Sequence, residues 1–453
     1  MKNADVVICG AGIGGISTAY MLSVKHGVKN ILLVDERSPM TLTSDKSTEC
    51  YRNWWSGPGD EMVRLMNRSI DIMEEIAEEC GNLFHMNQRG YLYATLDNDK
   101  TDDLVKFAKE ASLLGAGDVR FHNSSDNGYV PAEIEGFKQG VSGADIILDS
   151  ELIKKYFPYL SEDTKAVLHV RKAGWFSAQQ YGMYLFELAK ANGVRFIQDR
   201  ITNIELENDK VSSVELGSGE KIRTDVFVNA AGPMVGEVAE MLGIELPIFN
   251  ELHMKSSFND SASVINRDAP LVILIDKQDI GWSVEEREWL QEEEENKWLL
   301  ETLPSGAHFR PEGGSGANSV ILLWDLKEEK VEPEFPPELD PFYPELAMRG
   351  LTGIAPGLQT YVEKLPKPFL DGGYYTKTKE NRPLACEMGV DGAYLIGAMS
   401  GFGIMSSAAL AELLAARITG SELPDYALSF SLARYQDSDY KHKLENWSSD
   451  WQL

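Results

Sequence analysis

The sequence is poor in cysteine, and its few cysteines lie far apart. Only Cys9, Cys50, Cys80 and Cys386 occur in 453 residues, and no two of them have CxxC spacing. This pattern excludes a disulfide framework and gives no sign of a zinc or iron–sulfur site, so we expect no bound metal. A reducing compartment is the simplest environment for such a chain.

Positive charge is also scarce. The chain has 43 Lys and Arg against 71 Asp and Glu, which gives a formal net charge of −28 and a pI near 4.7. Nucleic acids and anionic membrane surfaces would repel such a protein, so we expect neither as a partner.

Long hydrophobic runs are missing as well. The sequence has no uninterrupted apolar span of about 18 residues, and no apolar segment precedes the first predicted strand at residues 6–9. We therefore expect neither a transmembrane segment nor export, and we expect the protein to be cytoplasmic.

Glycine, in contrast, is placed where a nucleotide would need it. The apolar strand 6–9 runs into the turn Gly10, Gly12 and Gly15, completed by Ile13 and Gly14, and a helical pattern follows. Gly10 allows the tight turn, Gly12 lets the backbone approach a pyrophosphate, and Gly15 lets helix and strand pack closely. The alternative to a nucleotide site is a glycine-rich turn in an ordinary βαβ unit.

An acidic residue stands where a ribose would lie. The second predicted strand, 31–34, ends at Asp35, about 20 residues after the last glycine of the turn, with Glu36 beside it. A carboxylate here accepts hydrogen bonds from ribose hydroxyls and disfavours a 2′-phosphate. We assign Asp35 and Glu36 to the nucleotide site.

Two later strands also end at small residues, and their presence bears on whether the nucleotide is FAD or NAD. One runs over 225–229, and the other runs from 393 into a glycine-rich loop before a helix at 406–417. Three strand-to-glycine elements suit a cofactor long enough to span a sheet, and FAD fits this better than NAD. From these elements we assign to the FAD site Ala231, Gly232, Gly397, Gly401, Phe402, Gly403, Ile404 and Met405.

Together these motifs resemble the D-amino-acid oxidase-like flavoprotein family, in the branch of sarcosine oxidase, glycine oxidase and dimethylglycine dehydrogenase. The resemblance also rests on four further segments, at 149–160, 228–232, 309–314 and 372–403. It implies an α/β fold of two domains (α+β in layout), in which a Rossmann-like FAD-binding domain is interleaved with an antiparallel-sheet substrate domain.

The order of the motifs predicts how the chain is divided. We expect the FAD-binding domain to comprise 1–84, 150–235 and 372–430, and the substrate domain to comprise 85–149 and 236–371. Residues 431–453 form a C-terminal tail.

Two surface segments fit neither domain's pattern. The acidic segment 285–301 lies among Trp282, Trp289 and Trp298, and it is either a solvated helix face or a lid or partner-binding helix. The proline-rich segment 328–344 cannot form a continuous helix, so we expect a connector.

A cation lies among aromatic residues at 47–55. The resemblance implies that this loop passes beside the flavin ring and that Arg52 holds the substrate carboxylate, which suits the planar fork of a guanidinium. The alternative is a surface arginine paired with Glu49 or Asp60. Trp54 and Trp55 belong either to the core or to a substrate cage.

Three departures from the resembled family bear on the substrate and on how the flavin is held. Phe402 and Met405 stand where sarcosine-oxidase-like proteins have a histidine and a lysine. The pocket is then more apolar, and we expect a substrate bulkier than glycine or sarcosine. Gly373 stands where those oxidases carry a flavin-linked cysteine, so we expect FAD to be bound non-covalently.

The catalytic candidates are less specific. The resemblance suggests Lys327 as a flavin-facing lysine that promotes oxygen reduction, and His253 is more often structural than catalytic. Residues that could orient the amine or stabilise reduced flavin are Tyr374, Tyr375, Lys377, Arg382, His253 and Lys255.

The sequence thus predicts an FAD-dependent oxidase of an amine or amino acid, with hydride transfer to the flavin. A dehydrogenase with another electron acceptor stays open, as do a flavin monooxygenase and a non-catalytic flavoprotein subunit. The expected partners are a small-molecule amine or amino acid and either oxygen or another redox acceptor, and a homo-oligomer is left open.

Overall fold

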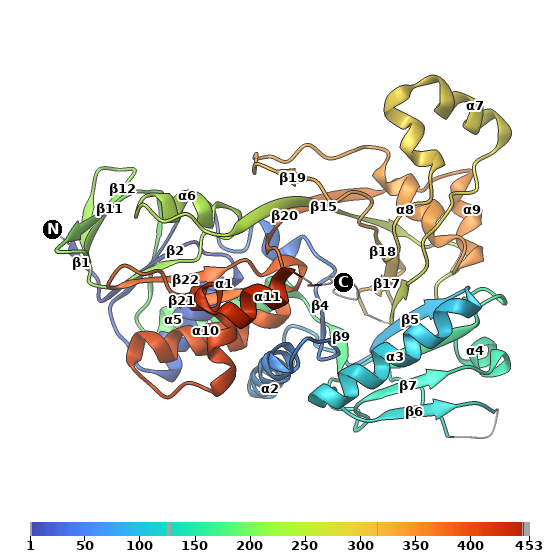
Figure 1. Cartoon of the computed structure of the whole chain (residues 1–453), viewed down its shortest axis with the longest axis horizontal. Coiled ribbons are helices and arrows are strands. Elements are labelled where there is room, and N and C mark those ends of the chain that lie inside the picture. The colour runs from blue at the N-terminus through green and yellow to red at the C-terminus, as the bar shows by residue number, and fades with distance from the viewer. Residues whose placement is uncertain (1, 125–127, 315, 446, 448–453) are drawn as a thin grey trace.

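The computed structural model describes residues 2–124, 128–314, 316–445 and 447. Two bodies share the chain: one is built around a parallel sheet and the other around a large, mostly antiparallel sheet (Figure 1). The long strands β15 (Ile248–Asn259) and β20 (Phe369–Thr378) run between them and pair with each other over ten residue pairs.

The parallel sheet is the Rossmann-like body predicted from the glycine motif. Its strand order is β10-β3-β2-β14-β22-β21, and only the pair β22–β21 is antiparallel. The strands are β2 (Val6–Cys9), β3 (Ile31–Asp35), β10 (Arg195–Gln198), β14 (Phe227–Asn229), β21 (Leu384–Glu387) and β22 (Ala393–Gly397). Near-continuous apolar runs in β2 and β3 suit strands that are covered on both faces.

Each face of this sheet has its own cover. On one face lie α1 (Ile13–Tyr20), α5 (Ala178–Ala191) and α10 (Gly403–Thr419), which pack around the alternate side chains Ile8 and Leu33. On the other face, Val7 and Leu32 pack against a small sheet of β1 (Lys2–Asn3), β13 (Lys221–Arg223), β12 (Lys210–Leu216) and β11 (Ile201–Glu207).

The large sheet has the order β19-β15-β18-β17-β16-β5-β8-β7-β6, with β20 pairing β15. It is mostly antiparallel, but β16–β5 and β6–β7 are parallel pairs. Its other strands are β5 (Tyr91–Thr95), β6 (Val119–His122), β7 (Ala144–Ile147), β8 (Ala166–Val170), β16 (Leu271–Leu274), β17 (His308–Glu312), β18 (Ser319–Leu323) and β19 (Lys330–Val331). Its outer face packs on α8 (Tyr343–Leu351) and on the segment around α4 (Ser150–Tyr156).

Sheet membership corrects the predicted segment boundaries at two points. Strand β8 lies within 150–235, which the order of the motifs assigns to the FAD-binding domain, yet it pairs with β5 and β7 in the large sheet. Strand β20 crosses the predicted boundary at 372 and pairs with β15. Both strands are apolar enough for either sheet, and strand partners at such separations are not encoded in local sequence.

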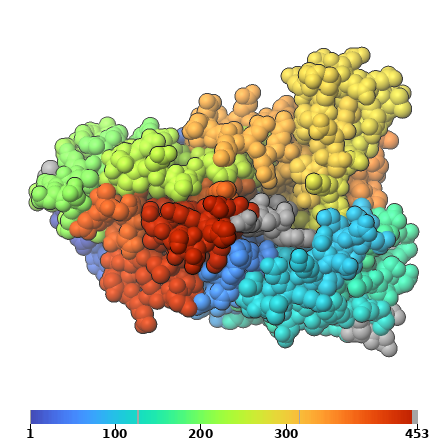
Figure 2. Space-filling model, viewed as in Figure 1, coloured from blue at the N-terminus to red at the C-terminus, as the bar shows by residue number. Residues whose placement is uncertain are grey.

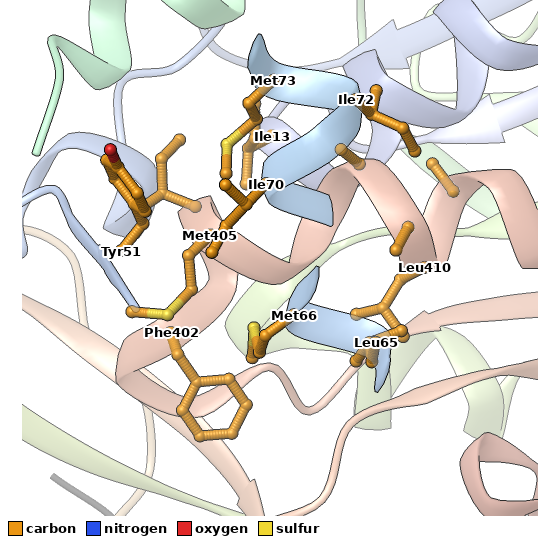
Figure 3. Packing of buried hydrophobic residues seen from close by; sticks show 14 of the residues in the cluster. Ile13, Tyr51, Leu65, Met66, Ile70, Ile72, Met73, Phe402, Met405 and Leu410 are labelled. Carbon is orange, nitrogen blue, oxygen red and sulfur yellow. The ribbon is translucent and has the colours of Figure 1, made fainter. Parts of the chain in front are cut away.

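Helix α10 forms the centre of the core next to the sheet. Its small residues let α2 (Glu61–Glu79) approach closely, and Figure 3 shows Leu65, Met66, Ile70 and Met73 of α2 directed toward it. In the described part of the chain, Ser400–Thr419 is the one helical stretch long and apolar enough to cross a membrane, and 72% of its window is buried. That burial identifies it as a core helix here.

The acidic insert projects from the large sheet, seen in yellow at the upper right of Figure 2. Its helix α7 (Val284–Glu292) begins with a capping box of Ser283 and Glu286, and Arg349 of α8 binds Glu286. Trp289 is 53% exposed, whereas Trp282 is half-buried and donates to the Leu299 carbonyl. The insert therefore has a solvated acidic face and an anchored base.

The two remaining predicted segments have simple structures. Residues 328–342 contain no helix, as their prolines require, and α8 begins at Tyr343. The predicted tail packs onto the FAD-binding body through the turn Leu432–Gln436, where buried Arg434 pairs with buried Glu380. Helix α11 (Ser438–Glu445) follows on the surface.

Candidate active site

Two adjoining cavities lie where the two bodies meet. The first lies at the carboxyl ends of β2, β14 and β22. The second lies between strand β4 (Cys50–Arg52) and the large sheet. Tyr375, Ser400 and Gly401 line both cavities, so a ligand in one can contact a ligand in the other.

The glycines of the first turn are required by close packing. Gly10 has φ +108°, and a Cβ built there would lie 2.2 Å from the Ala230 carbonyl oxygen. A Cβ on Gly15 would lie 1.9 Å from the Gly10 oxygen. Gly12 differs, because its Cβ would meet only the Ser44 hydroxyl, at 3.1 Å. Gly12, Ile13 and Gly14 all line the first cavity.

The end of β3 carries the predicted ribose-binding acid. The Asp35 carboxylate accepts hydrogen bonds from the amides of Ala11, at 2.7 Å, and Arg37, at 2.8 Å. Burial raises its pKa above the usual range despite these two donors. Glu36 is exposed, lies beside the Arg37 guanidinium and does not line the first cavity.

Most of the other predicted cofactor residues line the first cavity; Ala231 lines neither cavity. Ala398 and Ser400 have φ near +50°, which bends the chain sharply after β22. A Cβ on Gly401 would lie 2.6 Å from the Tyr375 ring, so this loop packs closely against β20. Gly232, Gly397, Gly401, Gly403 and Ile404 line the first cavity, and Phe402 and Met405 line the second.

These features fit a dinucleotide. The turn after β2 offers the N-terminal amides of α1, which have no partner within the helix. The cradle of glycines leaves backbone exposed to a phosphate, and Ser44 Oγ already accepts the amide of Ile13 at 2.9 Å. The cavity continues along the loop 397–404 toward the second cavity, as a flavin ring at its end would require.

Arg52 lies on the wall of the second cavity. It is 1% exposed; its Nε donates to the Trp54 carbonyl, and its guanidinium lies over the Trp55 ring at 4.5 Å. Among the described residues no carboxylate pairs with it, and its buried Nη2 has no hydrogen-bond partner. Glu49 faces Arg310 instead, at 3.9 Å, and Asp60 lies 4.0 Å from Arg64, so neither alternative partner is used.

Two cations of the large sheet hold the loop that carries Arg52. Arg310 Nε donates to the Thr48 carbonyl at 2.7 Å, and Lys255 Nζ donates to the carbonyls of Asp45 and Ser47. Backbone carbonyls held by these two cations give this loop a defined position. The sequence analysis singled out Lys255, but not its contact with this loop.

The rest of the second cavity is one face of the large sheet. His308 of β17 is in register with Leu323 of β18 and Ile273 of β16, and all three line the cavity. Asp325 follows two residues after Leu323, and Tyr375 and Lys377 alternate along β20. Side chains two residues apart share a face of a strand, which brings this set together.

A compensated ionic cluster lies on this face. His253 stacks on Tyr375, and its two ring nitrogens bind Asp325, at 2.6 Å, and Glu251, at 3.1 Å. Burial opposes a charged ring, but the two carboxylates outweigh it and raise the pKa of His253. Asp325 is half-buried, and although loss of solvent raises its pKa, His253 outweighs this and holds the pKa at about 2. With Lys377 paired to Glu251, two cations balance two anions.

The chain matches a known protein family. A family profile described as FAD dependent oxidoreductase (DAO) matches residues 5–417. The chain belongs to this family. Members of the DAO family bind FAD, so this protein is an FAD-dependent oxidoreductase. The first cavity, whose walls fit a dinucleotide, is the candidate site for this FAD.

Curated relatives of the chain include a dehydrogenase and an oxidase subunit. Dimethylglycine dehydrogenase of Rattus norvegicus is 23% identical over 59% of this chain and 28% of its own length. Sarcosine oxidase subunit beta of Rhizobium meliloti is 24% identical over 56% of this chain and 55% of its own length. The matched region thus covers about half or less of the length of each of these curated relatives.

Solved structures confirm the fold over nearly the whole chain. L-proline dehydrogenase from P. horikoshii has a TM-score of 0.73 and 18% identity, with 96% of this chain and 98% of that chain covered. Glycine oxidase from Bacillus cereus has a TM-score of 0.69 and 14% identity, with coverage of 94% and 98%. At these identities the likeness shows the DAO fold alone.

Two predicted catalytic residues lie away from the second cavity. Lys327 is exposed, and its ammonium lies over the Trp298 ring at 4.3 Å, because the chain has already left the sheet after β18. Tyr374 lines the first cavity, and its hydroxyl is used by the backbone of Glu334. Neither side chain is placed to act on a substrate in the second cavity.

Sequence reasoning also missed several residues of the site. Ser44 follows β3 by several residues and matches no fixed spacing, although it faces the glycine turn. His308 and Asp325 lie on different strands, and only their register brings them into one cavity. No alternation of polar and apolar residues marks Asp325, because β18 ends in a run of apolar residues. Trp54 is a core residue, whereas Trp55 lines the cavity.

The position of Lys327 gives a first prediction. Substituting Lys327→Met should change the rate at which air reoxidises the reduced flavin by no more than about twofold, the effect of an ordinary surface substitution. The rate is followed by the return of flavin absorbance after reduction. Lys377→Met is the matched variant for comparison: it also replaces a lysine by methionine, but Lys377 lines the second cavity and pairs with Glu251. A large slowing in Lys327→Met would restore the role that the sequence suggested for it.

Proposed function

We propose that this protein oxidises the C–N bond of an amino acid or N-substituted amine that carries a carboxylate. Hydride transfer to the flavin would leave an imine. Bound FAD supplies the hydride acceptor, and the chain supplies binding, orientation and exclusion of water. This proposal is in keeping with the amine and amino-acid substrates in the names of several relatives.

The observation that carries the proposal is the unpaired charge of Arg52. His253 and Lys377 are balanced by Glu251 and Asp325, whereas Arg52 has no acidic partner among the described residues. A buried guanidinium without a partner is costly unless a ligand supplies the anion. A substrate carboxylate would satisfy Nη2 and complete the charge balance of the cavity.

The apolar part of the cavity supports the predicted size of the substrate. Phe402 packs edge-on against Trp55, with ring centroids 5.0 Å apart, and Met405 lines the same wall. Leu271, Ile273 and Leu323 add aliphatic surface from the large sheet. We propose that this wall holds an amine with a side chain bulkier than those of glycine and sarcosine.

Non-covalent attachment of FAD is our second prediction. At Gly373 a Cβ would lie 3.0 Å from Lys46 Cβ, which leaves little room for the thiol that resembled oxidases carry there. Acid precipitation should therefore release the yellow colour into the supernatant. Flavin that stays with the precipitated chain, measured by absorbance after washing, would contradict non-covalent binding.

The electron acceptor distinguishes two candidate functions. The sequence slightly favours an oxidase, but Lys327 lies on the surface and Lys377 is engaged by Glu251, which favours a dehydrogenase. Reduced enzyme that stays reduced for minutes in air, yet is reoxidised by a quinone or dye, would identify a dehydrogenase. Rapid reoxidation by air alone would identify an oxidase.

One experiment tests the function itself. Purified holoenzyme is mixed anaerobically with a panel of amino acids and of primary, secondary and tertiary amines, with and without a carboxylate, and bleaching of the flavin is recorded. We expect carboxylated amines to reduce the flavin much faster than their decarboxylated counterparts. Equal rates for both groups would overturn the proposed role of Arg52.

A further inference from the structure

His308 is a residue of the second cavity to which the proposed function has so far given no role. It begins β17, and its neighbours in register, Ile273 and Leu323, are apolar. A histidine among aliphatic side chains on a cavity wall needs partners for both ring nitrogens. Only one of the two has a partner among the described residues.

The hydrogen bond of His308 fixes its tautomer. Nδ1 lies 2.8 Å from the carbonyl oxygen of Gly306, and a carbonyl can only accept. Nδ1 therefore carries the proton, and Nε2 of the neutral ring is left as an acceptor. Because His308 lines the second cavity, Nε2 is the polar atom that this side chain offers to a ligand there.

Burial, together with nearby cations, favours the neutral form of His308 in the free protein. Burial lowers its pKa below the usual range, and Arg52 and Arg310 lower it further. The Gly306 carbonyl and Asp325 raise the pKa, but not enough to cancel this decrease. A carboxylate bound to Arg52 would offset one of these cations and so make Nε2 a stronger base when substrate is present. The other charged groups on this face are His253, Glu251 and Lys377.

We propose that His308 Nε2 accepts a proton from the ammonium group of a substrate whose carboxylate is bound by Arg52. This inference rests on the proposed function. In the step, one N–H bond of the ammonium breaks, an Nε2–H bond forms, and the electron pair stays on the substrate nitrogen. The ionised carboxylate of Asp325 stabilises the imidazolium that forms. The proton passes to solvent when the product leaves.

The step explains how the substrate becomes reactive. Amino acids enter neutral solution as ammonium ions, whereas oxidation of the C–N bond needs the nitrogen lone pair. An acceptor beside the bound nitrogen removes that proton inside the cavity, where water is largely excluded. The same acceptor sets the orientation of the amine relative to the carboxylate.

Ligand binding tests the acceptor without any turnover. Pyrrole-2-carboxylate carries an N–H that is not basic, and 2-furoate has the same shape without it. In wild-type holoenzyme, pyrrole-2-carboxylate should bind roughly 2- to 12-fold tighter, the net worth of one hydrogen bond, as measured by perturbation of the flavin spectrum. His308→Leu should bind both acids about equally, whereas His308→Gln, which keeps an acceptor, should retain a preference.

Controls separate this inference from the proposed function. His26→Leu, which lies beside Thr419 at the C-terminal end of α10 and lines neither cavity, should keep the wild-type preference. Arg52→Ala should weaken both acids alike; if it weakens neither, or if neither acid binds the wild type, the proposed function is wrong and this inference with it. If Arg52→Ala weakens both but His308→Leu keeps the full preference, only the role of His308 is overturned.

The pH dependence of flavin reduction tests the proton transfer. With the fastest carboxylated amine from the panel, His308→Leu and His308→Gln should reduce the flavin at least about 10²-fold more slowly than wild type near pH 7. The deficit should shrink toward pH 10, where solvent deprotonates the amine. A deficit that is constant with pH would show a purely structural role and overturn the assignment.

Discussion

Substituting Gly12→Val should abolish FAD binding while leaving the fold intact. The Cβ of any larger residue at this position points to the first cavity and meets only the Ser44 hydroxyl, at 3.1 Å. The valine methyl groups would fill the space through which the backbone approaches the pyrophosphate. Losing two charge-assisted contacts, at about 1.5–3 kcal/mol each, corresponds to roughly 10²- to 10⁴-fold in Kd.

Flavin content per chain, read from the visible spectrum of the purified protein, measures this effect, and the far-UV circular dichroism of the apoprotein checks its fold. Gly281→Val is the matched control, because a Cβ at Gly281 meets nothing within 4 Å. Gly15→Ala differs from both, since its Cβ would lie 1.9 Å from the Gly10 oxygen and would disturb the turn itself. Full occupancy in Gly12→Val would mean that the pyrophosphate lies elsewhere.

The nucleotide half of the site could be predicted because its determinants are local. Gly15 is glycine because of the Gly10 oxygen in the same βαβ unit. Gly10 also meets Ala230, just after the adjacent strand β14, but its positive φ alone favours glycine there. The spacing to Asp35 follows from the length of one helix and one strand. Such a unit has the same dimensions in any protein, so a short stretch of sequence is enough to identify it.

The substrate half could be predicted only in part because it depends on pairing between distant strands. In β20 the adjacent residues Tyr374 and Tyr375 are both buried, so alternation does not reveal which one faces the cavity. The structure directs the Tyr374 hydroxyl to Glu334 and stacks Tyr375 on His253. Lys327 lies only two residues beyond Asp325, yet the end of the sheet separates their surroundings.

The two roles considered for Arg52 show what the folded structure adds to the sequence. Its sequence neighbours Glu49 and Asp60 made a surface ion pair a reasonable alternative. In the folded chain Glu49 faces Arg310 of β17. That competition between cations from distant segments is invisible in the sequence, and it is what leaves Arg52 without an anion.

Substituting Arg52→Ala should therefore lower kcat/KM for the best carboxylated substrate roughly tenfold to several hundredfold, with little change in flavin content. A charge-assisted bidentate contact contributes on the order of 1.5–3 kcal/mol, and more when the abandoned carboxylate stays buried. Arg52→Lys should recover only part of the loss, because an ammonium lacks the planar fork.

A matched variant separates substrate binding from packing. Arg89 is also a buried arginine, 4% exposed, and lies over the Trp175 ring at 4.8 Å, but it donates to backbone carbonyls and does not line the second cavity. Arg89→Ala should lower thermal stability and leave kcat/KM within a few fold of wild type. Unchanged kcat/KM in Arg52→Ala would instead favour an uncharged amine held by Trp55 and Phe402, because only a substrate without a carboxylate can ignore the loss of that guanidinium.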